Sequence, residues 1–147
     1  MSEELRPCPF CGGRVGDGRA GKVFEQGATM SEHDVQTAFF QLAHYYEGTY
    51  PCLRWMHAVP NGGLRNKRVA VKLKAEGAKA GIWDVFLPYA VGNWHGLYLE
   101  TKYGANKLTE KQVEFGEYLK SAGYCAHVVR SADEAMNILV SYLEGEL

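Results

Sequence analysis

The spacing of apolar positions divides the chain after residue 30 into helical and strand-like segments. Apolar residues three or four apart predict three helices. The first begins at Ser31 and ends near Gly48, the second opens at Thr109 and stops at Gly123, and the third follows Ser131. Each of the three starts has a Ser or Thr followed three residues later by an acidic or amide side chain. This pattern is typical of a capping box, in which side chains satisfy the free amides of the first helical turn.

Four other segments have the apolar character of strands: residues 53–59, 82–87, 97–102 and 124–129. In the second of these, Trp83, Val85 and Leu87 alternate with Asp84 and Phe86, which predicts that the three large side chains share one face. A short helix carrying Val69, Val71 and Leu73 is expected between the first two strands. The order α-β-α-β-β-α-β-α predicts an α/β fold, with a mixed central sheet of about four strands flanked by helices.

Three charged residues lie within the predicted second and third strands. Glu100 and Lys102 are two residues apart, so they share a face about 6.6 Å apart along the strand. Asp84 interrupts an apolar run, where an unpaired charge is costly. Carboxylates bind Mg²⁺ or Mn²⁺, which can activate water for hydrolysis of a phosphodiester. We expect Asp84 and Glu100 to be metal ligands together with the backbone carbonyl of Thr101, and Lys102 to orient water or balance phosphate charge. A salt-bridged cluster without metal is the alternative.

Positive charge is concentrated in one segment. The whole chain has 16 Lys+Arg and 17 Asp+Glu, so its net charge of −1 does not by itself indicate a nucleic-acid partner. Residues 65–79, however, contain a single acid, Glu76, and they follow a turn whose glycines would allow backbone amides to approach phosphate. The alternative is a solvated helix face. The predicted DNA-binding residues are Asn61, Gly62, Gly63, Arg65, Lys67, Arg68, Lys72, Lys74, Lys79 and Lys107, and Lys111 could extend the track.

Residues 1–29 are rich in glycine and are expected to form a flexible segment before a single domain at 30–147. Cys8 and Cys11 flank Pro9-Phe10 and resemble half of a zinc knuckle. A closed zinc site requires four ligands, so a second chain or a distant Cys or His would have to complete it. The alternative is a remnant knuckle without metal. The polar start and the absence of a long apolar run predict a cytoplasmic protein with no membrane span.

The motifs together resemble those of a known family. They are Glu32-x-x-x-Gln36, Pro60-Asn61-Gly62-Gly63-x-Arg65, Glu76-Gly77-x-Lys79-x-Gly81-Ile82-x-Asp84, Glu100-x-Lys102, Gln112 and Gly123-Tyr124. Over residues 30–144 the chain resembles the VRR-NUC nucleases of the PD-(D/E)-x-K superfamily, which implies a restriction-endonuclease-like core. The superfamily's usual Pro before the Asp is replaced by Trp83.

The resemblance implies that Asp84, Glu100 and Lys102 are the catalytic core, with Glu32 and Gln112 as further active-site positions and Glu32 as a third metal ligand. Two of these residues also have simpler interpretations. Glu32 lies in a first helical turn, where the helix dipole favours a carboxylate, and Gln112 fits the capping box that begins at Thr109.

The function implied by the resemblance is that of a Mg²⁺- or Mn²⁺-dependent, structure-specific DNA endonuclease. Stand-alone members act as homodimers on branched DNA such as four-way (Holliday) junctions, and the setting implied is a bacterial or phage-infected cell. Two alternatives stay open at this point. One is a nuclease of the same fold that acts on linear duplex, flap or single-stranded DNA, and the other is a non-catalytic, zinc-assisted nucleic-acid-binding module.

Overall fold

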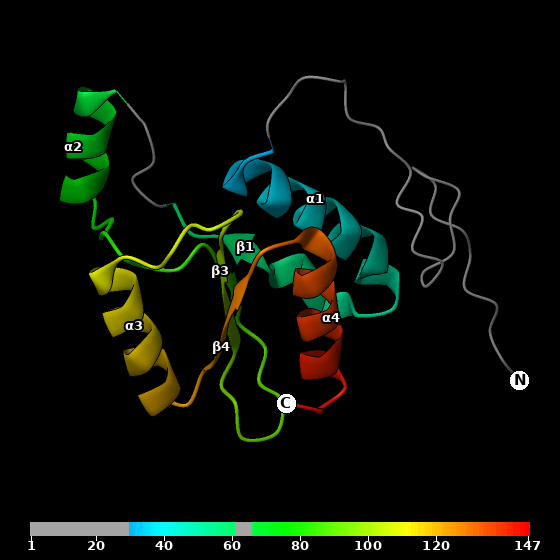
Figure 1. The fold of residues 1–147 in the computed structure, drawn as a ribbon. Helices are drawn as coiled ribbons and strands as arrows, with labels where there is room; N and C mark the ends of the chain where they lie inside the picture. The colour runs from blue at the N-terminus through cyan, green and yellow to red at the C-terminus, as the bar shows by residue number, and fades with distance from the viewer. Residues whose placement is uncertain (1–29, 61–65) are drawn as a thin grey trace, which may run out of the picture.

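The computed structural model describes residues 30–60 and 66–147. A mixed sheet with the strand order β1-β2-β3-β4 forms its centre (Figure 1). β1 pairs antiparallel with β2, β2 pairs antiparallel with β3, and β3 pairs parallel with β4. The strands are β1 (His57–Ala58), β2 (Val85–Leu87), β3 (Leu97–Thr101) and β4 (Cys125–Val129), and the helices are α1 (Glu32–Tyr45), α2 (Lys67–Ala75), α3 (Glu110–Ser121) and α4 (Ala132–Leu143). The predicted fold class and element order are confirmed.

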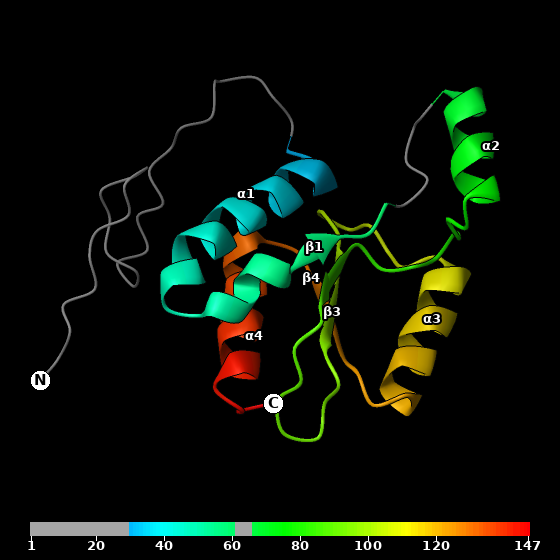
Figure 2. The same cartoon turned by 180° about the vertical axis from the view of Figure 1, so that it is seen from behind.

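Helices cover the two faces of the sheet unequally. α1 and α4 lie together on one face and α3 lies on the other, as the two opposite views show (Figures 1 and 2). The larger core lies under α1 and α4, where Phe39, Leu87 and Leu139 are fully buried. A smaller cluster under α3 is centred on Trp83 and Leu119. Each such side chain contributes about 1.5–3 kcal/mol through burial, so the larger core supplies most of the rigidity of the sheet.

Two of the three predicted capping boxes form completely. At α1, Ser31 accepts from the amide of Asp34, whose carboxylate accepts from the amide of Ser31. The box at Thr109 and Gln112 is also complete. At α4, Ser131 caps the helix, but the Glu134 carboxylate accepts from the amide of Arg130, one residue earlier than predicted.

The predicted strand at residues 53–59 is mostly wrong. Pro51–Trp55 is a 3₁₀ helix, which follows another short one at Tyr46–Gly48, and only His57–Ala58 joins the sheet. Leu53 and Met56 are both buried and lie three residues apart, which is the repeat of a 3₁₀ helix. The apolar run therefore reflects one buried helical edge rather than alternation across a sheet.

The predicted strand at residues 82–87 begins late, at Val85. Trp83 packs in the cluster under α3, whereas Val85 and Leu87 pack in the core under α1 and α4, so the expected common face is wrong. The reason lies at Gly81, whose φ of +90° is rare for residues with a side chain. A Cβ there would also lie 2.6 Å from the Cβ of Lys111. The chain thus turns tightly against α3 before the strand starts.

α2 extends from the body of the domain beside the N-terminal end of α3 (Figures 1 and 2). It is the predicted short helix, and none of its residues is buried. Val69 and Val71 are exposed, so its apolar positions do not contribute to either core. In the part of the chain described, no helix combines the length and the apolar character required to cross a membrane.

Candidate active site

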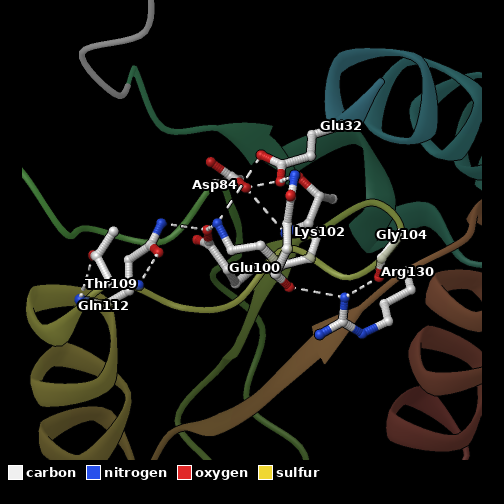
Figure 3. A network of polar contacts seen from close by, with 10 residues as sticks. Glu32, Asp84, Glu100, Lys102, Gly104, Thr109, Gln112 and Arg130 are labelled. Atoms are coloured by element: carbon white, nitrogen blue, oxygen red, sulfur yellow. Dashed lines mark hydrogen bonds and ion pairs between the residues drawn. The ribbon is translucent and has the colours of Figure 1, made fainter. Parts of the chain in front are cut away.

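The three predicted catalytic residues come together at one end of the β2–β3 pair (Figure 3). Val85 of β2 pairs with Leu99 of β3. The antiparallel register therefore places Asp84, just before β2, beside the end of β3, where Glu100 lies and Lys102 follows. The antiparallel pairing of β2 with β3 thus brings the carboxylates of Asp84 and Glu100 close together, although the two residues are 16 positions apart in sequence.

Asp84 is held by Thr101. Oδ2 of Asp84 accepts from the backbone amide of Thr101 at 3.0 Å and from its hydroxyl at 2.7 Å. Thr101 is only 1% exposed, so both donors are fixed by the sheet and by packing. Hydrogen bonds to an ionised acceptor are among the strong ones. Sequence analysis did not predict that the amide and hydroxyl of Thr101 would hold Asp84. The carbonyl of Thr101 as a metal ligand stays a prediction.

Glu100 has a buried carboxylate, and only one of its two oxygens has polar contacts among the described residues. Its Oε1 lies 3.0 Å from Nζ of Lys102 and accepts from Nε2 of Gln112. Its Oε2 is buried and has no hydrogen-bond partner among the described residues. Burial, and then the nearby charge of Asp84, raise the pKa of Glu100 to about 7, although Lys102 opposes this shift. A buried carboxylate oxygen of this kind is costly unless a cation or a donor reaches it.

This arrangement fits a divalent cation. Burial, and then the charge of Asp84, disfavour the ionised form of Glu100, and a positive ion nearby would favour it. Carboxylate oxygens are hard ligands suited to Mg²⁺ or Mn²⁺. Within residues 30–60 and 66–147, no three His, Cys, Asp or Glu side chains form a group that could hold an ion. Mg²⁺ commonly binds through one or two carboxylates plus waters and substrate phosphates, so Asp84 and Glu100 are a sufficient protein contribution.

Gln112 makes one contact at the start of α3 and another at Glu100. Its Oε1 accepts from the amide of Thr109 at 2.9 Å and completes the cap of α3. Its Nε2 donates to Glu100. The helix-capping interpretation is confirmed, and the active-site role of Gln112 stays a prediction with which its contact to Glu100 agrees.

A groove of about 1830 Å³ runs over the catalytic cluster. α1, α2 and α3 all contribute to its walls, and Asp84, Glu100 and Lys102 line it. Of the predicted DNA-binding residues, Lys74 and Lys79 line this groove. Lys67, Arg68, Lys72 and Lys107 are exposed elsewhere, and Lys72 lies 3.8 Å from Glu76. Asn61, Gly62, Gly63 and Arg65, like Cys8 and Cys11, lie outside the described residues.

Comparison with known proteins was made for the sequence and for the fold. No family model and no curated protein matches the sequence. A solved structure described as a "VRR_NUC domain protein" superposes with a TM-score of 0.67 and 29% sequence identity, covering 80% of this chain and 92% of that one. The chain contains a VRR-NUC domain. Its sheet and helices agree with a restriction-endonuclease-like VRR-NUC fold.

One part of the VRR-NUC site joins residues that sequence analysis did not connect. Glu32 lies 4.0 Å from Lys102, and its Oε1 accepts from Nδ2 of Asn106 at 2.9 Å. Arg130 in turn donates to the carbonyls of Gly104 and Asn106 at 2.8 and 3.0 Å (Figure 3). Arg130 therefore fixes the loop that positions Glu32 beside Lys102. No sequence pattern marks this link, because Asn106 lies 74 residues from Glu32 and 24 from Arg130.

The raised pKa of Glu100 gives the metal-free VRR-NUC domain a specific pH dependence. A carboxyl whose folded pKa lies above its unfolded value of about 4.3 stabilises the fold below that pH and loses this contribution as pH rises to about 7. We therefore expect the contribution of Glu100 to the free energy of unfolding, measured with urea in EDTA, to fall between pH 4.5 and 7. A Glu100→Gln variant lacks this titration, so the parent should lose stability relative to it over that window. A difference between the two proteins that is independent of pH would contradict the expectation.

Proposed function

We propose that this nuclease-type domain is a Mg²⁺- or Mn²⁺-dependent DNA endonuclease that hydrolyses phosphodiester bonds in branched DNA, four-way junctions included. The observation that supports this most directly is the buried, unpartnered Oε2 of Glu100 beside Asp84, at the floor of a groove. Such an oxygen is retained at a cost in stability, which a divalent ion would offset. The named "VRR_NUC domain protein" of similar structure supports nuclease chemistry in general.

The residues around the cluster have distinct tasks in this proposal. Thr101 orients Asp84, and Gln112 holds Glu100, so both carboxylates would be preorganised before substrate binds. When bound, Mg²⁺ or Mn²⁺ would lower the pKa of a water molecule and polarise the phosphate. In the reaction a bond forms between the water oxygen and phosphorus as the water gives up a proton to solvent. The bond from phosphorus to the leaving oxygen breaks, and that oxygen takes a proton from solvent.

Lys102 supplies positive charge next to the reacting phosphate in this proposal. Its residue is 6% exposed, and its ammonium group contacts Glu100 at 3.0 Å and approaches Glu32 at 4.0 Å. A preorganised ammonium in a site with little water stabilises developing negative charge more strongly than it would in solvent. Glu32 and Asn106 act through Lys102 by limiting where its side chain can lie.

The positive charge that would meet DNA lies on the α2 side of the groove. Lys74 and Lys79 line the side formed by α2 and the segment that follows it, and the other cations of α2 extend from the same exposed helix. Contacts of this kind to phosphates do not depend on sequence and are weakened by salt. Two such grooves in a C2 homodimer would present two active sites to two strands, which is the arrangement that a four-way junction requires.

The decisive experiment compares substrates and metals with the full chain. A four-way junction, a flap, a linear duplex and a single strand of shared sequence are each incubated with Mg²⁺, Mn²⁺ or EDTA. We expect cleavage with either ion, none in EDTA, and a higher kcat/KM for the junction than for the duplex. If only the linear duplex or the single strand is cleaved, the substrate is linear DNA and not the proposed branched DNA. Intact DNA under every condition would overturn the proposal and favour a binding module instead.

A further inference from the structure

A stripe of three side chains on α3 continues the active-site groove. Lys111, Phe115 and Tyr118 occupy positions i, i+4 and i+7, which lie on one side of a helix. All three line the groove that contains Asp84 and Glu100. Lys111 lies next to Gln112, which contacts Glu100, so the stripe starts at the catalytic cluster and leads away from it.

The two aromatic rings form a braced, open platform. Tyr118 is 62% exposed. Its ring stacks on that of Phe115, with centroids 6.3 Å apart and planes 23° apart. Phe115 is in turn held edge-on by Tyr98 of β3, at 5.7 Å and 90°. A large ring that is fixed from below and exposed above, inside a groove, offers apolar area for a flat ligand.

The charges on this wall differ from those on the opposite wall. Glu110 and Glu114 line the groove near Lys111, so the α3 wall is of mixed sign and is a poor continuous track for phosphates. Lys74 and Lys79 supply the positive charge on the α2 side. A DNA strand in the groove would therefore turn its phosphates toward α2 and its bases toward α3. Stacking of a base on an aromatic ring requires no charge and tolerates any base.

The helix geometry sets how far from the reaction such a base would lie. Six residues separate Gln112 from Tyr118, which is about 9 Å along α3. Stacked nucleotides are about 3.4 Å apart along one strand, so this length corresponds to two or three nucleotides. Within a duplex both faces of a base are covered by its neighbours, so away from the duplex ends only an unpaired base can offer a face to Tyr118.

We propose that Tyr118, supported by Phe115, is a stacking site for an unpaired base two or three nucleotides from the phosphate held at Asp84 and Glu100. The proposal rests on the proposed nuclease function and narrows its substrate class. The preferred DNA has unpaired nucleotides beside the cleaved bond, as at a fork, a flap or the open centre of a junction.

Base stacking can be measured without cleavage. Oligonucleotides of one sequence carry the fluorescent base 2-aminopurine at successive positions, either single-stranded or in a full duplex, and they bind the full chain in Ca²⁺. We expect quenching at one or two positions of the single strand and none in the duplex. Tyr118→Ala should abolish the quenching, and Tyr118→Phe should preserve it. Val113→Ala is the matched control, because Val113 is an exposed apolar residue of α3 that does not line the groove.

Kinetics provide the second arm. Tyr118→Ala should raise KM for a substrate with unpaired nucleotides about tenfold, within the range that loss of one stacking ring produces, and should do so more than for a duplex. Equal effects on both substrates, or quenching that survives Tyr118→Ala, would overturn the stacking site even if the parent cleaves DNA. Quenching that depends on Tyr118 in a protein without cleavage activity would support the stacking site and overturn the nuclease function instead.

Discussion

Replacing Asp84 with Asn is expected to lower kcat by about 10³-fold or more in the presence of Mg²⁺ or Mn²⁺. Asn has nearly the same shape, and its carbonyl oxygen can still accept from the amide and hydroxyl of Thr101. The variant should therefore fold as the parent does. It lacks the negative charge that is proposed to hold a cation and so to allow activation of water. The measurement is the single-turnover rate of cleavage, with urea unfolding in EDTA as the check on the fold.

The control for Asp84→Asn is Asp133→Asn. Asp133 is an exposed carboxylate in the first turn of α4, away from the groove. Its neutralisation removes a favourable interaction with the helix dipole, worth less than about 1 kcal/mol. We expect the parent rate for this variant. An Asp84→Asn protein that is folded and retains a tenth of the parent rate would refute the assigned site.

Gly116→Val is expected to destabilise the domain by about 1–3 kcal/mol. Gly116 is buried in the middle of α3, and a Cβ at this position would lie 2.5 Å from Cζ2 of Trp83. Trp83 is itself buried, and its indole donates to the carbonyl of Gln112 at 2.9 Å. The added side chain would push α3 away from Trp83, and the contact between Gln112 and Glu100 would weaken with it. Urea unfolding and the cleavage rate of the folded variant measure the two effects.

Glu117→Val is the matched control for Gly116→Val, because it places the same side chain at the next position of α3, which is exposed. Surface changes of this kind usually stay within about 0.5 kcal/mol. Equal stability of the two variants would show that Trp83 can make room, and that the close approach of α3 to Trp83 is not required.

The closeness of Glu100 to Lys102 and the position of Gln112 could be predicted from sequence because they depend on local rules. Alternation along the third strand places Glu100 and Lys102 on one side, and their 3.0 Å contact follows from that spacing. The capping pattern at Thr109 correctly placed the start of α3, and therefore Gln112. In each case the signal lies within a few residues.

Other features could not be predicted because they depend on distant packing. Trp83 lies on the α3 side of the sheet, unlike Val85 and Leu87. It follows the glycine turn at Gly81, which passes close to Lys111 of α3. The loop contacts of Arg130 and the position of Tyr118 in the groove arise from the way β3, β4 and α3 assemble. The positions of Asn61, Gly62, Gly63 and Arg65, and zinc binding by Cys8 and Cys11, stay predictions.

Gln112 contacts both the first turn of α3 and the buried carboxylate of Glu100. The two contacts therefore belong to one thermodynamic cycle. One amide group closes the helix at Thr109 and restrains Glu100 at its other end. The strength of the contact between Gln112 and Glu100 and the fraying of the helix start are therefore coupled, and the coupling free energy is the same in both directions. The order of the helix end that forms one wall of the groove is thus linked to the charge of Glu100 and to what Glu100 binds.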